Sequence, residues 1–95
     1  MLAIIIAPPK YILAMHRKSP GGGDFFWLPM WSDPVRAQGV LDRLGPGWVM
    51  VECKDPNPAI LYTLMAGLVR CPTSGYIINP GPGETRIPVT LGSVN

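Results

Sequence analysis

The side chains that could support catalysis are few. The chain has a single histidine, His16, which lies beside Arg17 and Lys18. A Ser/His/Asp or Cys/His site needs a histidine that tertiary structure brings to its nucleophile. The positions of His16 and Cys53 in the sequence allow a catalytic Cys/His pair, but no motif supports one. We expect His16 to be a solvated residue at the end of a strand. The acidic residues are Asp24, Asp33, Asp42, Glu52, Asp55 and Glu84. No two of them have the local spacing that is typical of a paired-acid hydrolase. The sequence therefore predicts no enzyme activity.

Metal and disulfide chemistry also have little support. The two cysteines, Cys53 and Cys71, and the one histidine cannot supply the four ligands of a structural zinc site. Both cysteines lie in apolar contexts, which favours buried thiols in a reducing cytoplasm. We expect no metal, no cofactor and no bridge between Cys53 and Cys71.

Two glycine-rich segments are candidates for anion binding. The segment SPGGGD, at 19–24, lacks the Lys-Ser/Thr pair of a phosphate-binding loop and is interpreted as a hairpin turn. The segment NPGPGE, at 79–84, is expected to be an ordinary turn. Its alternative is a concavity of backbone N–H groups that holds an anion with help from Arg86.

Charge argues against nucleic acid as a partner. The net charge is +2, and the aromatic residues between Phe25 and Trp31 have no lysine or arginine among them. A single-stranded RNA platform interleaves aromatic and basic side chains on its strands. Charged residues make up only 15% of the chain, below the usual ~25%, so we expect exposed apolar surface for a partner or a second copy.

The elements follow from local signals. Asp33-Pro34 and Asn57-Pro58 each predict a helix start, and Gly45 predicts the end of the first helix. The inward stripe of the first helix is Ala37, Val40, Leu41 and Leu44. That of the second is Ile60, Leu61, Leu64, Met65 and Leu68. Strands are expected at 2–7, 11–16, 25–31, 48–53, 76–79 and 86–91.

This order predicts one α+β domain over residues 1–95, with a mixed sheet of about five or six strands and two helices packed on one face. The apolar run Leu2–Ala7 is typical of a strand covered on both faces. It is too short to span a bilayer and has no preceding basic residue, so we expect neither a signal peptide nor a membrane anchor.

The aromatic strand is the candidate partner surface. Trp27, Pro29 and Trp31 share one strand face, and Pro29 indicates an edge or bulge because it has no N–H. With both helices on one side of the sheet, these residues would be uncovered and available to a partner. The alternative is that both faces of this strand belong to the core.

Three segments together resemble the SseB N-terminal type of domain, found in serine-sensitivity enhancing proteins and their small relatives. They are LPMWSDPVRAQGVLDRLG, YTLMAGLV and GYIINPGPGE, within residues 11–91. The resemblance implies a small α+β fold that serves as an interaction or regulatory module, with no family catalytic residues.

Our leading hypothesis is a non-enzymatic interaction module that binds a protein partner or itself, as a two-fold homodimer. The second is a binder that sequesters an anionic nucleotide signal between two subunits, as in phage counter-defence. Its ligand residues would be Asn79, Gly81, Gly83, Arg86 and Trp31, with the indole of Trp27 or Trp31 stacked on a base. A hydrolase is the third and least supported hypothesis.

Overall fold

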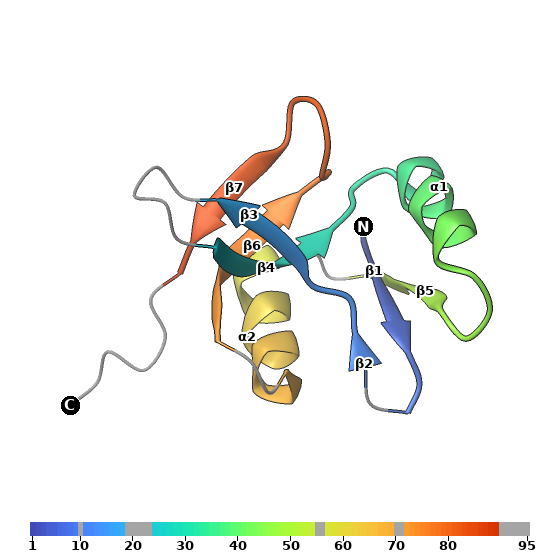
Figure 1. Cartoon of the computed structure of the whole chain (residues 1–95), viewed down its shortest axis with the longest axis horizontal. Coiled ribbons are helices and arrows are strands. Elements are labelled where there is room, and N and C mark those ends of the chain that lie inside the picture. The colour runs from blue at the N-terminus through green and yellow to red at the C-terminus, as the bar shows by residue number, and fades with distance from the viewer. Residues whose placement is uncertain (10, 19–23, 55–56, 70–71, 90–95) are drawn as a thin grey trace.

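The structure, a computed structural model, describes residues 1–9, 11–18, 24–54, 57–69 and 72–89 (Figure 1). Its elements in chain order are β1 (Leu2–Ala7), β2 (Tyr11–Ile12), β3 (Met15–Lys18), β4 (Asp24–Met30), α1 (Pro34–Leu44), β5 (Val49–Cys53), α2 (Pro58–Leu68), β6 (Thr73–Ile78) and β7 (Thr85–Pro88). The α+β class predicted from the sequence is confirmed.

The strands form two sheets. Sheet A is antiparallel with the order β2-β1-β5, and sheet B has the order β3-β4-β6-β7 with one parallel pair, β4 and β6. Among the described residues, one bridge joins the sheets: Ala3 N donates to Trp31 O at 2.7 Å, and Trp31 N donates to Ala3 O at 2.9 Å. The sequence predicted one sheet of five or six strands, and the structure divides seven strands between two.

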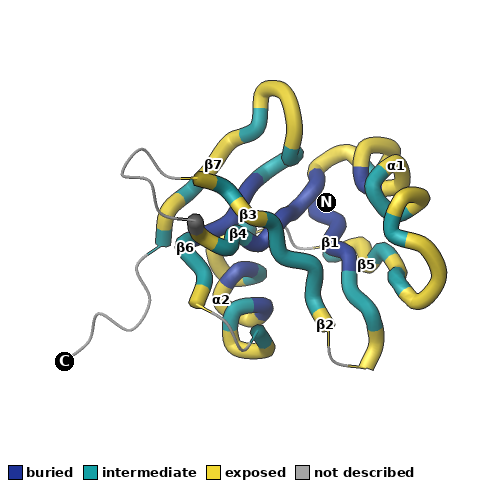
Figure 2. Tube along the Cα trace, in the orientation of Figure 1, coloured by how far each residue is buried: buried dark blue, intermediate teal, exposed yellow. Residues whose placement is uncertain are grey.

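Strand β1 separates two hydrophobic cores. Leu2 and Ile4 pack with α2, β4 and β6, whereas Ala3 and Ile5 pack with Trp31 and α1. The two helices therefore lie on opposite faces of β1, where the sequence analysis placed both on one face. The predicted burial of Leu2–Ala7 on both faces holds for Leu2, Ala3, Ile4 and Ile5, each less than a tenth exposed (Figure 2). A strand covered on both faces needs a layer on each side, and α1 and α2 supply the two layers.

Both predicted helix starts and the predicted stop are confirmed. Asp33 caps α1 by accepting a hydrogen bond from Val35 N, and Asn57 caps α2 by accepting from Ala59 N and Ile60 N. Gly45 caps the end of α1 with φ +86°, a value that suits glycine. The predicted stripe of α1 faces the core that contains Trp31.

The predicted stripe of α2 is wrong in part. Tyr62 and Met65 are the buried residues of this helix, and the Tyr62 hydroxyl lies 2.6 Å from Thr73 Oγ1. Leu64 is 64% exposed, although we expected it in the core, and Ile60 and Leu68 are exposed to a similar extent. Almost every position of α2 is apolar, so the sequence does not mark its solvent side.

Pro29 lies in a central strand, yet at a local edge. Strand β4 pairs with β3 only as far as Trp27. The chain next pairs on this side at Trp31, one residue beyond β4, where it forms the bridge to Ala3 of β1. Alternate residues of a strand direct their backbone groups to opposite neighbours, so position 29 shares the side that Trp31 uses for Ala3. No strand pairs there at position 29 within the described residues, and the missing N–H of Pro29 therefore breaks no ladder bond.

Two further expectations fall partly or wholly outside the described residues. The turn expected around 19–23 and the partner thiol Cys71 both lie there, and the Cys53–Cys71 prediction stays a prediction. Among the helices of the described segments, none is long and apolar enough to cross a membrane.

Candidate functional site

An open apolar groove of about 1080 Å³ lies between sheet A and α2. Sheet A contributes one wall and α2 contributes the other. The lining residues are Ile4, Ile6, Pro8, Pro9, Tyr11, Ile12, Val51, Leu61, Leu64, Met65, Gly67, Leu68 and Val69. None of these side chains carries a charge, and only Tyr11 has a polar side-chain atom. The described lining is therefore suited to apolar groups.

The α2 wall continues onto an exposed helix face. Ile60, Leu64 and Leu68 recur at intervals of four residues and are 61%, 64% and 69% exposed. Ala59, Thr63 and Gly67 form the adjacent row and are also exposed. Residues four apart lie one above another on a helix, so the two rows make one continuous surface. It carries bulky apolar side chains beside small ones and no charged group.

The sheet wall also extends into solvent. Val51 pairs with Ile4 and Val49 pairs with Ile6, so both valines face the groove side of sheet A. They are partly exposed, and Tyr11 on β2 is exposed as well. Large contiguous apolar surfaces of this kind mark interaction sites in soluble proteins.

The aromatic residues predicted to form the partner surface are mostly internal. Trp31 is fully buried against Ala3, Ile5 and Ala37, and Pro29 is also fully buried. Trp27 is half-buried, and neither indole N–H has an acceptor among the described residues. Trp31 and Pro29 therefore belong to the core of the monomer and not to its surface. For Trp31 the reason is that α1 packs on β1 and β5 and brings Ala37 against the indole.

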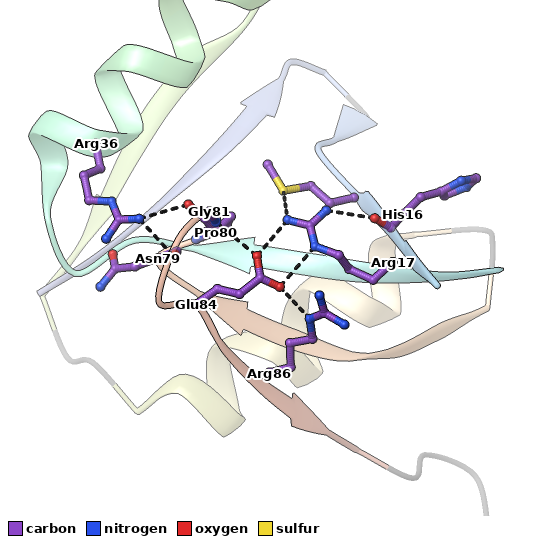
Figure 3. Close-up of polar contacts among 9 residues, drawn as sticks. His16, Arg17, Arg36, Asn79, Pro80, Gly81, Glu84 and Arg86 are labelled. Atoms are coloured by element: carbon purple, nitrogen blue, oxygen red, sulfur yellow. Dashed lines mark hydrogen bonds and ion pairs between the residues drawn. The ribbon is translucent and has the colours of Figure 1, made fainter. Parts of the chain in front are cut away.

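The turn between β6 and β7 is built around one carboxylate (Figure 3). Glu84 accepts hydrogen bonds from Gly81 N at 3.0 Å, from Arg17 Nη2 at 2.9 Å and from Arg17 Nε at 3.0 Å. Arg86 Nε donates to the same carboxylate. The Glu84 side chain is only 13% exposed, so these partners replace most of its water.

Asn79 fixes the other end of this turn. It adopts φ +53°, its Oδ1 accepts from Ser32 N at 3.0 Å, and its Nδ2 donates to Ser32 Oγ at 2.8 Å. Arg36 on α1 donates to the carbonyl oxygens of Asn79 and Pro80. The turn is thereby attached to the junction of β4 and α1.

These contacts bear on the predicted anion site. The structure brings Asn79, Gly81 and Arg86 together, but each of their donors described above already has an acceptor within the chain. Gly83, with φ +79°, lies exposed at the tip of the turn. Trp31 is buried away from solvent and has no face free to stack on a base. An external anion that used Gly81 N or Arg86 Nε would have to displace Glu84, and this competition does not favour the nucleotide-binding hypothesis.

The electrostatics of the turn are dominated by arginine. The hydrogen bonds from Arg17 are the largest influence on Glu84, and with those from Gly81 and Arg86 they lower the pKa of its carboxyl from 4.5 to about 2. Glu84 in turn raises the pKa of Arg17. The charge of Glu84 is therefore fixed over the neutral range.

The residues considered for catalysis do not form a site. His16 lies on β3 in sheet B with its ring 4.1 Å from that of Phe26, whereas Cys53 lies on β5 in sheet A. In the described part of the chain, no group of three or more His, Cys, Asp or Glu side chains could hold a metal ion.

No family model, curated protein or solved structure matches the chain. The groove and the exposed face of α2 are therefore the features of the molecule that bear on its function. Sequence reasoning missed both, and the available signal was a helix without a single charged residue from Pro58 to Leu68.

Proposed function

We propose that the chain is a non-enzymatic interaction module that binds a protein partner, or a second copy of itself, through the apolar groove and the adjoining face of α2. The observation that carries this proposal is the exposure of Ile60, Leu64 and Leu68 beside a groove whose described lining residues carry no charge. Burial of such side chains is the main favourable term in association between proteins.

The composition supports the same conclusion. A chain with 15% charged residues and 47% hydrophobic residues leaves apolar surface open to water. The resemblance to the SseB N-terminal type of domain also points to an interaction or regulatory role. We place this role in the cytoplasm, because the cysteine content and context favour a reducing compartment.

Site-specific photo-cross-linking in cells tests the proposal. A photoreactive amino acid replaces Leu64, and in a matched control it replaces Val35, which is 77% exposed on α1. We expect irradiation to yield a discrete protein adduct from position 64 and none from position 35. Mass spectrometry of the adduct then identifies the partner as another protein or as the chain itself. If neither position forms a protein adduct, the proposal fails.

A further inference from the structure

The geometry points to a second copy of this chain as the occupant of the exposed α2 face, in a two-fold dimer in which α2 packs on its symmetry mate. This inference rests on the proposed function and specifies its partner. It also replaces the aromatic strand β4 with α2 as the surface of self-association.

The first support is the shape of α2. Its exposed face has a bulky row, Ile60, Leu64 and Leu68, beside a shallow row, Ala59, Thr63 and Gly67. Helices pack when a ridge of side chains on one lies in a groove on the other, and rows four residues apart form the commonest ridges. A two-fold axis lets the bulky row of each copy lie in the shallow row of its mate. The face is thus complementary to itself.

The second support is charge. In a two-fold contact each side chain near the axis meets its own copy, so any charge there would face a like charge. From Pro58 to Leu68 there is no charged residue, and the described residues that line the groove beside it carry none. A distinct partner chosen by charge complementarity would find no charged side chain to pair with on the described part of α2.

The third support is area. At about 100 Å² of apolar surface for each fully exposed large side chain, the exposed parts of six residues together offer roughly 340 Å² per copy: Ile60, Leu64, Leu68, Tyr11, Val49 and Val51. A standard interface takes ~800 Å² from each partner. The apolar surface is therefore sufficient for the centre of such an interface, with a polar rim around it.

Sedimentation velocity over micromolar to high micromolar concentrations tests the dimer. We expect the wild-type chain and the control Val35→Glu to sediment as dimers, and Leu64→Glu and Leu64→Lys each to raise the dissociation constant at least ~10-fold. An equimolar mixture of the two Leu64 variants should recover the dimer, because opposite charges then meet near the axis. A wild-type monomer, or a Leu64→Glu variant that dimerises like the wild type, would overturn the inference.

Gly67→Leu separates association from folding. Among the described residues, no atom outside the neighbouring backbone of α2 lies within 4 Å of the position that its Cβ would occupy. Leucine is also a better helix former than glycine, so the monomer should not lose stability. The same leucine fills the shallow row, and we expect the dimer to weaken at least ~10-fold. Unchanged dimerisation by Gly67→Leu counts against α2 packing. A monomeric wild type that still forms a position-64 adduct with another protein overturns self-association and leaves the proposed function standing.

Discussion

Arg17 and Glu84, 67 residues apart in the chain, form a bidentate ion pair in which Arg17 Nε and Nη2 each donate to a different carboxylate oxygen. The pair ties β3, at one edge of sheet B, to the turn that precedes β7, at the other edge. Paired forks of this kind are stronger than single contacts between long flexible side chains. The two hydrogen bonds hold the turn before β7 against β3.

This pair predicts a loss of stability in acid. The folded-state pKa of Glu84 lies below its unfolded value, so its contribution to the free energy of unfolding is complete above about pH 4.5 and is lost as pH falls toward about 2. We expect Glu84→Gln to be less stable than the wild type at neutral pH and to lose less stability across this window. Urea denaturation at a series of pH values measures both effects. As a control, Asp42→Asn removes a carboxylate on α1 that bonds only to Gln38 among the described residues and should leave the window intact.

Neighbouring residues of α2 should differ sharply in their contribution to monomer stability. Met65 is 3% exposed, and Met65→Ala should lower the free energy of unfolding by ~2–5 kcal/mol. Leu64 is 64% exposed, and Leu64→Ala should cost below ~1 kcal/mol. Chemical denaturation at concentrations where the chain is monomeric makes the comparison. Equal losses at the two positions would contradict the orientation of α2, in which Met65 faces the core and Leu64 faces solvent.

Asn79 should contribute to stability through both its side-chain hydrogen bonds and its tolerance of a positive φ. Asn79→Gly removes two hydrogen bonds to Ser32, each worth ~0.5–1.5 kcal/mol, and keeps a residue that tolerates φ +53°. Asn79→Ala removes the same bonds and adds a left-handed strain of ~1–2 kcal/mol. Thermal unfolding should therefore rank the wild type above the glycine variant and the glycine variant above the alanine variant. An alanine variant as stable as the glycine variant would show that the backbone at this position is relaxed.

The features that the sequence predicts well are local ones. Asp33 and Asn57 each precede a proline, and such a pair defines a helix start with no information from the rest of the chain. The run Leu2–Ala7 predicts a strand buried on both faces for the same reason. That prediction conflicts with placing both helices on one side of the sheet, and the structure resolves the conflict in favour of the buried strand.

The candidate site could not be predicted because it depends on which side of α2 meets the sheets. Hydrophobic periodicity identifies the inner face of a helix only when polar residues mark the outer one, as they do on α1. On α2 the choice between Met65 and Leu64 is made by packing against Leu2, Leu28 and Tyr76, which come from three different strands. The same holds for Glu84 and Arg17, whose contact depends on the order of strands in sheet B.

The parallel pairing of β4 with β6 has a kinetic consequence. Leu28 pairs with Tyr76, and α1, β5 and α2 all lie between them in the chain. Closing so long a loop costs entropy before any contact between the two strands repays it, and proteins dominated by such contacts fold more slowly than helical bundles of similar size. The centre of sheet B is therefore expected to form late, after the β3–β4 hairpin. Until it forms, Tyr62 and Met65 on the inner face of α2 lack the packing that Leu28 and Tyr76 provide.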